Sequence, residues 1–147
     1  MSDPDELKLD YLIVADAADA VGGKLYLLGG GWDRLLVPQL PGPPAAPFAV
    51  AVGISVPWGL TNKKLRLSID VLDADGGHVA QLAGGEIEVG RPPGIRVGVS
   101  QRLQVAVPAQ PHFASAGRYA IQCAIDALIL GSTAIEVAAA TATTSVV

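Results

Sequence analysis

The feature that most constrains the fold of this chain is the alternation of apolar and polar residues over short segments. The first segment has apolar side chains at every second position, at Leu7, Leu9, Tyr11 and Ile13. The same period of two recurs in five more segments, 48–56, 65–71, 86–89, 102–107 and 118–126. Successive side chains of a β-strand point to opposite faces, so this period indicates strands with one buried face. We therefore expect an all-β protein.

The segments between these strands have the composition of turns. They are rich in Gly, Pro and Asp, at 22–23, 38–47, 57–59, 75–77, 91–94 and 116–117. Short strands separated by such turns predict a two-sheet antiparallel β-sandwich, immunoglobulin-like or a related Greek key. The stretch from Phe113 to Tyr119 resembles the start of a strand in immunoglobulin-like sandwiches, where a tyrosine hydroxyl bonds nearby backbone. An ordinary core tyrosine is the alternative for Tyr119.

The length and the two ends of the chain predict one domain in the cytoplasm. The 147 residues fit one domain, which we place at 1–137, followed by a low-complexity end at 138–147 that forms either an edge strand or a frayed tail. The acidic N-terminus lacks the basic and apolar pattern of a signal peptide. No apolar run reaches the roughly 18 residues of a membrane-spanning helix, so we expect no membrane partner.

The charge distribution argues against nucleic acid as a partner. The formal net charge is −4, and the ten basic residues are scattered apart from the group Lys63, Lys64 and Arg66. Phosphate binding needs a concentrated basic face, so the sequence predicts no nucleic-acid partner. We interpret the Lys63 group as the solvated start of a strand.

No catalytic, metal-binding or cofactor-binding group is predicted. Cys123 is the single cysteine, and with His78 and His112 it offers no zinc-like spacing. The segment 73–77 resembles the middle of a calcium loop but lacks ligands at its first and last positions, so a hairpin turn explains it better. A cluster of Asp16, Asp19 and Asp33 would form if the first two strands pair, although solvation or turn capping is the simpler role.

Three consecutive glycines interrupt a strand in the segment KLYLLGGGWDRLLVP, which runs from Lys24 to Pro38. A phosphate-binding loop would need a following lysine or the start of a helix, and neither is present. We therefore predict a bulge, a bend between sheets or a close backbone approach. The residues of this structural motif are Gly29, Gly30, Gly31, Trp32, Asp33 and Arg34.

One predicted strand face carries only small, uncharged residues. It consists of Ala49, Ala51, Gly53 and Ser55. A solvated strand face normally carries long polar side chains, so either another segment of the chain or a second subunit covers this one. The second alternative predicts self-association and a homo-oligomer.

The segment GGKLYLLGGGWDRLLVP, preceded by LIVADAADA, resembles the signature of a family of short uncharacterised bacterial proteins that also occur in phage-related contexts. The family pattern has the form ADxA…GKLxxxGGGWDxxxxxxxP, and the resemblance extends loosely through LRLSIDVLDADG and GRYAIQCAID. The resemblance implies a compact β-sandwich. It implies no activity, substrate or cofactor.

Three functions remain open at this point. The first is a non-enzymatic module for protein interaction or assembly. The second is a small-molecule or carbohydrate-binding sandwich, with Trp32 and Trp58 beside the loops 22–23 and 38–47 as an aromatic platform. The third, an enzyme that uses the carboxylates Asp16, Asp19 and Asp33, is the least favoured because no acid–base pair is recognisable.

Overall fold

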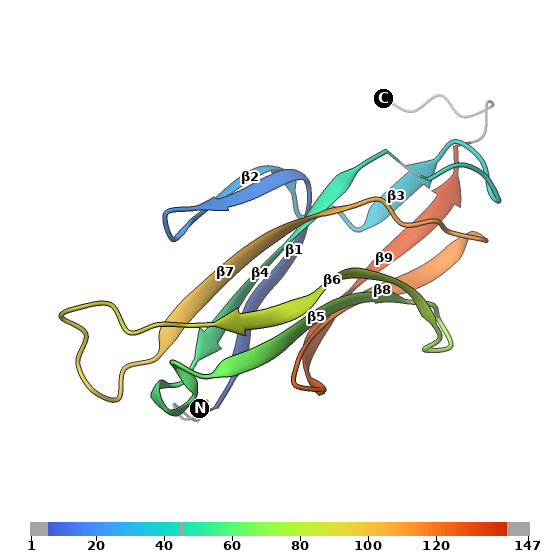
Figure 1. Ribbon diagram of the computed structural model, residues 1–147. Coiled ribbons are helices and arrows are strands. Elements are labelled where there is room, and N and C mark those ends of the chain that lie inside the picture. The colour runs from blue at the N-terminus through green and yellow to red at the C-terminus, as the bar shows by residue number, and fades with distance from the viewer. Residues whose placement is uncertain (1–5, 45, 141–147) are drawn as a thin grey trace.

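The computed structural model describes residues 6–44 and 46–140. Over these residues the chain forms nine β-strands and one short 3₁₀ turn (Figure 1). The elements are β1 (Lys8–Val21), β2 (Lys24–Gly30), β3 (Arg34–Val37), β4 (Phe48–Val56), η1 (Trp58–Leu60), β5 (Lys64–Leu72), β6 (His78–Glu88), β7 (Gln101–Ala109), β8 (Gly117–Ile125) and β9 (Leu128–Ala139). None of the described residues belongs to a helix that could cross a membrane.

The first sheet has the strand order β2-β1-β4-β7 and is antiparallel throughout. Its long strand β1 has two partners: the half before Ala15 pairs with β4, and the half after Ala15 pairs with β2. After Ala15 the β1–β2 hairpin therefore leaves β4 as a two-stranded ribbon, and its tip at Gly23 bends back to Gln104 of β7. Since strands in such ribbons twist strongly, the sheet curls into a half-barrel (Figure 1).

The second sheet has the order β3-β9-β8-β5-β6. Here the prediction of purely antiparallel pairing is wrong for one pair, because β3 runs parallel to β9 with Arg34 beside Glu136 and Val37 beside Ala139. The chain enters this sheet as a crossing from the first sheet, and a crossing strand has no hairpin that would fix its direction. The all-β class and the two sheets are confirmed, whereas the sandwich and its immunoglobulin-like arrangement stay predictions.

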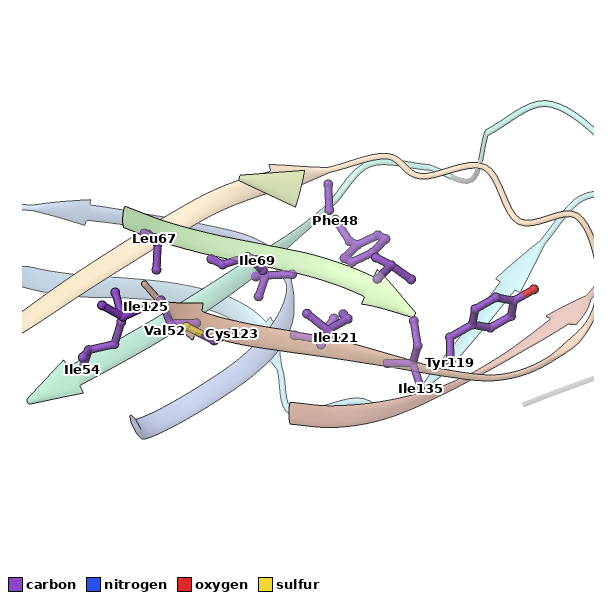
Figure 2. Close-up of a cluster of buried hydrophobic side chains, with 14 of the residues drawn as sticks. Phe48, Val52, Ile54, Leu67, Ile69, Tyr119, Ile121, Cys123, Ile125 and Ile135 are labelled. Carbon is purple, nitrogen blue, oxygen red and sulfur yellow. The ribbon is translucent and has the colours of Figure 1, made fainter. Parts of the chain in front are cut away.

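The core lies between the two sheets. It is built from the alternating apolar rows of β4, β5 and β8 with two residues of β9, and Figure 2 shows side chains from all four strands in contact. Ile54, Ile69 and Ile121 are completely buried. Each such side chain contributes about 1.5–3 kcal/mol relative to an exposed one. At one end of the core the Tyr119 hydroxyl donates to the Ser115 carbonyl over 2.7 Å, which is the backbone bond expected for a tyrosine at this position.

The end of the chain differs in part from the prediction of an edge strand or frayed tail at 138–147. Ala138 and Ala139 belong to β9, which lies between β3 and β8 and is therefore not an edge strand. Residues 141–147 lie outside the described part of the chain. The tail prediction for those residues stays untested.

Candidate functional site

The three glycines mark the point where the chain leaves the first sheet. Strand β2 ends at Gly30 and β3 begins at Arg34 in the other sheet. Gly29 and Gly31 have φ values of 62° and 91°, which side chains other than glycine rarely adopt. The Gly31 N–H donates to the Val14 carbonyl over 2.8 Å and fixes the start of the crossing. The predicted bend between sheets is therefore what these glycines form.

Trp32 fixes the position of the segment that crosses between the sheets. Its indole N–H donates to Asp16 Oδ1 over 3.1 Å, and its ring meets Phe48 edge to face at a centroid distance of 5.5 Å. A Cβ on Gly29 would lie 2.4 Å from Asp16 Oδ2, so the glycine leaves room for the carboxylate that holds the tryptophan. Asp16 therefore has a structural partner in Trp32, while the backbone carbonyl of Asp33 accepts the Glu136 N–H.

The small-residue face of β4 is covered by the chain itself. Ala49 and Ala51 are 5% and 0% exposed, and the ring of Tyr11 lies against Gly53, where a Cβ would come within 2.0 Å of it. Ser55 donates to Asp10, which also accepts from Arg102 at 3.0 Å. Of the two alternatives, another segment of the same chain therefore accounts for the burial of this face. The homo-oligomer stays a prediction that this face no longer supports.

The tip of the ribbon is tied back to the sheet by Gln104 of β7. Its amide donates to the Gly23 carbonyl over 2.7 Å, and its side-chain oxygen accepts from the Tyr11 hydroxyl. Burial raises the pKa of Tyr11; Arg102 nearby lowers it in part and Asp10 raises it. The hydroxyl therefore stays protonated at neutral pH and serves as a donor to Gln104.

The outer strand of the ribbon exposes apolar side chains on both of its faces. Leu28 is 72% exposed, Tyr26 57% and Leu27 38%. Leu27 and Leu28 are adjacent and so point to opposite faces of the strand. Together with Ala17, Ala18 and Asp19 of β1, these three residues line an open hollow of about 260 Å³.

The four edge strands of the two sheets differ in their protection against pairing with another chain. Strand β3 has only four residues, β6 has two register irregularities and two glutamates, and β7 contains Pro108. Short length, bulges, charge and proline are the usual devices that block an exposed edge. Strand β2 has a single charge, Lys24 at its start, and its regular part from Lys24 to Leu28 has none of the other devices.

The two tryptophans do not form a common platform. Trp32 contacts Phe48 at the start of β4, whereas Trp58 follows the end of the same strand. Nine extended residues separate their positions by about 26 Å. The guanidinium carbon of Arg91 lies 3.7 Å from the centroid of the Trp58 ring. The aromatic platform predicted for ligand binding is therefore not assembled at one end of the molecule.

A small polar cluster that the sequence did not reveal lies on the second sheet. Asp70 accepts from Ser68 and is 2.9 Å from His78 Nε2. Pairing of β5 with β6 brings His78 opposite Leu72, and this register is the only signal that links the residues. A nucleophile triad needs histidine between serine and carboxylate, whereas here the carboxylate is in the middle. The arrangement therefore does not activate the serine.

The remaining candidates offer no reactive group. Burial raises the pKa of Cys123 to about 11, and the residue is completely inaccessible in the core, so its thiolate is not formed near neutral pH. Within residues 6–44 and 46–140 no three His, Cys, Asp or Glu side chains gather in a metal-like group. The segment 73–77 is a turn in which Asp73 Oδ1 accepts the N–H groups of Asp75 and Gly77.

A family model covers most of this chain. It matches residues 10–138 and describes a family of unknown function, DUF6941. The chain belongs to this family. The match supports the resemblance to an uncharacterised family, while the signature motif and the bacterial or phage-related origin stay predictions. No curated protein matches the sequence.

Among solved structures, 19 chains match. One is the Pseudomonas fluorescens alkylpurine DNA glycosylase AlkC bound to DNA containing an abasic site analog. The match has a TM-score of 0.48 and 12% sequence identity, and it covers 90% of this chain and 30% of the glycosylase chain. A likeness of this size carries no argument about what this chain does.

The exclusion of nucleic acid predicted from the charge distribution is corrected. The partly similar chain was solved bound to DNA, and the exclusion itself rested on the net charge of the whole sequence. A net charge summed over the sequence does not describe the local charge of one surface.

Proposed function

We propose that this protein is a non-enzymatic interaction module that binds an extended segment of another protein along the β1–β2 ribbon. The observation that carries the proposal is the unprotected edge of β2, where Tyr26, Leu27 and Leu28 are exposed beside unpaired backbone. A regular edge strand of this kind is a template for a further strand.

The apolar side chains of β2 indicate which kind of peptide would bind along this strand. An added strand would form main-chain hydrogen bonds with Lys24–Leu28, and its alternate side chains would lie against Tyr26 and Leu28 on one face and Leu27 on the other. Since these three side chains are apolar, the matching segment is an extended peptide with apolar residues at alternate positions. The hollow of about 260 Å³ beside them is large enough for one such side chain.

A crosslinking experiment tests the proposal. A photoreactive amino acid is placed at position 28 and, as a matched control, at position 128, because Leu128 is also an exposed strand leucine at 54%. The protein captured at position 28 is purified and its affinity is measured for Leu28→Lys and Leu128→Lys. We expect Leu28→Lys to weaken binding at least tenfold, since an introduced charge would have to be desolvated at the new strand pair, about 1.4 kcal/mol or more.

The comparison with Leu128→Lys gives the result that would contradict the proposal. Both substitutions replace an exposed leucine, and surface changes of this kind alter stability by about 0.5 kcal/mol or less. Equal affinity of the two variants for the captured protein, or equal capture at positions 28 and 128, would show that the β2 edge is not the binding surface.

A further inference from the structure

The connection between β6 and β7 has an unusual charge composition. The stretch 89–102 contains three of the ten Lys and Arg residues and none of the fourteen Asp and Glu residues. Figure 1 shows this connection projecting from one end of the molecule. The Asn62 N–H donates to the Val89 carbonyl over 2.7 Å, so Lys63 lies beside the start of the same stretch. Four basic residues therefore lie in this stretch or next to its start: Lys63, Arg91, Arg96 and Arg102.

Other basic residues at this end have acidic neighbours. Lys64 is paired in register with Glu88, and Arg66 with Glu86. Arg102 bonds to Asp10. These neighbours reduce the positive potential along β5 and β7. Lys63, Arg91 and Arg96 are exposed and form no ion pair with a carboxylate of residues 6–44 and 46–140.

Arg91 is fixed in place by neutral groups. Its Nε donates to the Thr61 hydroxyl over 2.5 Å, its Nη2 donates to the Trp58 carbonyl over 2.9 Å, and its guanidinium carbon lies over the Trp58 ring. Thr61 is 2% exposed, and its hydroxyl in turn donates to the Trp58 carbonyl over 2.6 Å. None of these three contacts neutralises the guanidinium. Its charge therefore remains available to a ligand, and its orientation is set before the ligand arrives.

The surface beside Arg91 is an open hollow of about 450 Å³ that is also lined by Arg102, Gln101 and Pro92. The cations extend from this hollow along the projecting loop to Arg96, and Val97 next to it is 82% exposed. A single phosphate would need cations that converge on one point. Cations spread along a hollow and a loop fit a chain of phosphates instead.

We propose that this end of the molecule is a binding site for single-stranded nucleic acid, separate from the β2 edge. Phosphates lie along Lys63, Arg91 and Arg96, and one unpaired base stacks on the outer face of the Arg91 guanidinium, on the side away from Trp58. Stacking of bases on guanidinium planes and backbone contacts to basic grooves are the usual means of holding single strands. Exposed Val97 adds an apolar contact for a neighbouring base.

Fluorescence anisotropy tests the proposal with a fluorescein-labelled oligo(dT) of about 12 nucleotides, a length within the usual site sizes. The unmodified protein is titrated between about 50 and 200 mM salt, and we expect binding that weakens steeply as salt rises. Arg96→Ala should lower the slope of log K against log salt by about one, because it removes one phosphate contact. Arg91→Lys keeps the charge but removes the planar face, so affinity should fall severalfold with the slope unchanged.

Arg118→Ala is the control. Arg118 lies near the start of β8, where it pairs in register with Glu136, and it is not part of the proposed site. This substitution should leave affinity and slope unchanged. The proposal is overturned if no binding occurs at about 100 μM protein in low salt, a limit near ordinary non-specific affinity. It is also overturned if Arg118→Ala matches Arg96→Ala, if the duplex of the same sequence binds as tightly, or if only anionic phosphatidylserine vesicles bind.

Discussion

At the scale of single residues, Gly53 shows how a missing side chain shapes this fold. The ring of Tyr11 occupies the space that a Cβ would fill. We expect Gly53→Ala to destabilise the protein by about 1–3 kcal/mol, as overpacking of a filled interior does. Urea unfolding followed by circular dichroism measures this change.

A matched substitution separates the clash from the general effect of replacing glycine in a strand. Gly85 of β6 has no atom within 4 Å of an added Cβ and no positive φ. Gly85→Ala should leave the free energy of unfolding within about 0.5 kcal/mol of the unmodified protein. A similar loss in both variants would mean that the Tyr11 contact is not the cause.

The residue types of the sequence predicted a local feature only where it does not depend on contacts between distant segments. For Gly29–Gly31, the absence of the lysine and helix that a phosphate loop requires excluded that loop and left a bulge, a bend or a close backbone approach as alternatives. The contact of Trp32 with Asp16 is different, because it depends on the curl of β1 and on the crossing that follows β2. The small face of β4 indicated a cover, but composition does not tell whether the cover comes from the same chain.

At the scale of elements, the β1–β2 ribbon is held at its tip by one side chain. We expect Gln104→Ala to release the ribbon locally, because the bonds to Gly23 and Tyr11 are both lost. Hydrogen exchange of the Leu25–Leu28 amides should become severalfold faster, while amides around Ile121 in the other sheet keep their rates.

The corresponding change in the second sheet is the control. Gln81 is an exposed residue of β6, and Gln81→Ala should leave exchange of the ribbon unchanged. Equal exchange rates of the ribbon amides in Gln104→Ala and in the unmodified protein would contradict the proposed role of Gln104.

The alternation of apolar and polar residues predicted the strands that have one buried face. It did not predict strand β9, which lacks a regular polar face, or the pairing of β9 with β3. Strands β4, β5 and β8 match the alternating rows that the sequence shows. Strand β9 lies between β3 and β8 and reads LILGSTAIEVAA, without a regular polar face. Its parallel partner β3 is about a hundred residues away, and a pairing at that distance leaves no local signal.

At the scale of the whole molecule, the two sheets share one core. Buried residues of β4 pack against those of β5, β8 and β9, so neither sheet has an interior of its own (Figure 2). Chain crossings also join the sheets, at Gly31–Asp33 between β2 and β3 and at η1 between β4 and β5. Loss of packing in one sheet therefore exposes the apolar face of the other.

This shared core predicts a single cooperative unfolding transition. Trp32 packs against the core near the start of β4 and Trp58 lies beyond the end of that strand, so the two indoles report on opposite ends of β4. We expect Trp32→Phe and Trp58→Phe, each with one remaining tryptophan, to show tryptophan fluorescence midpoints in urea that coincide with the circular dichroism midpoint of the same variant. The fluorescence midpoint and the circular dichroism midpoint are compared within each variant and not between variants, because either substitution can alter overall stability. A Trp32 signal that changes before the circular dichroism signal would show that the ribbon and its crossing unfold separately, and that the two sheets do not form one cooperative unit.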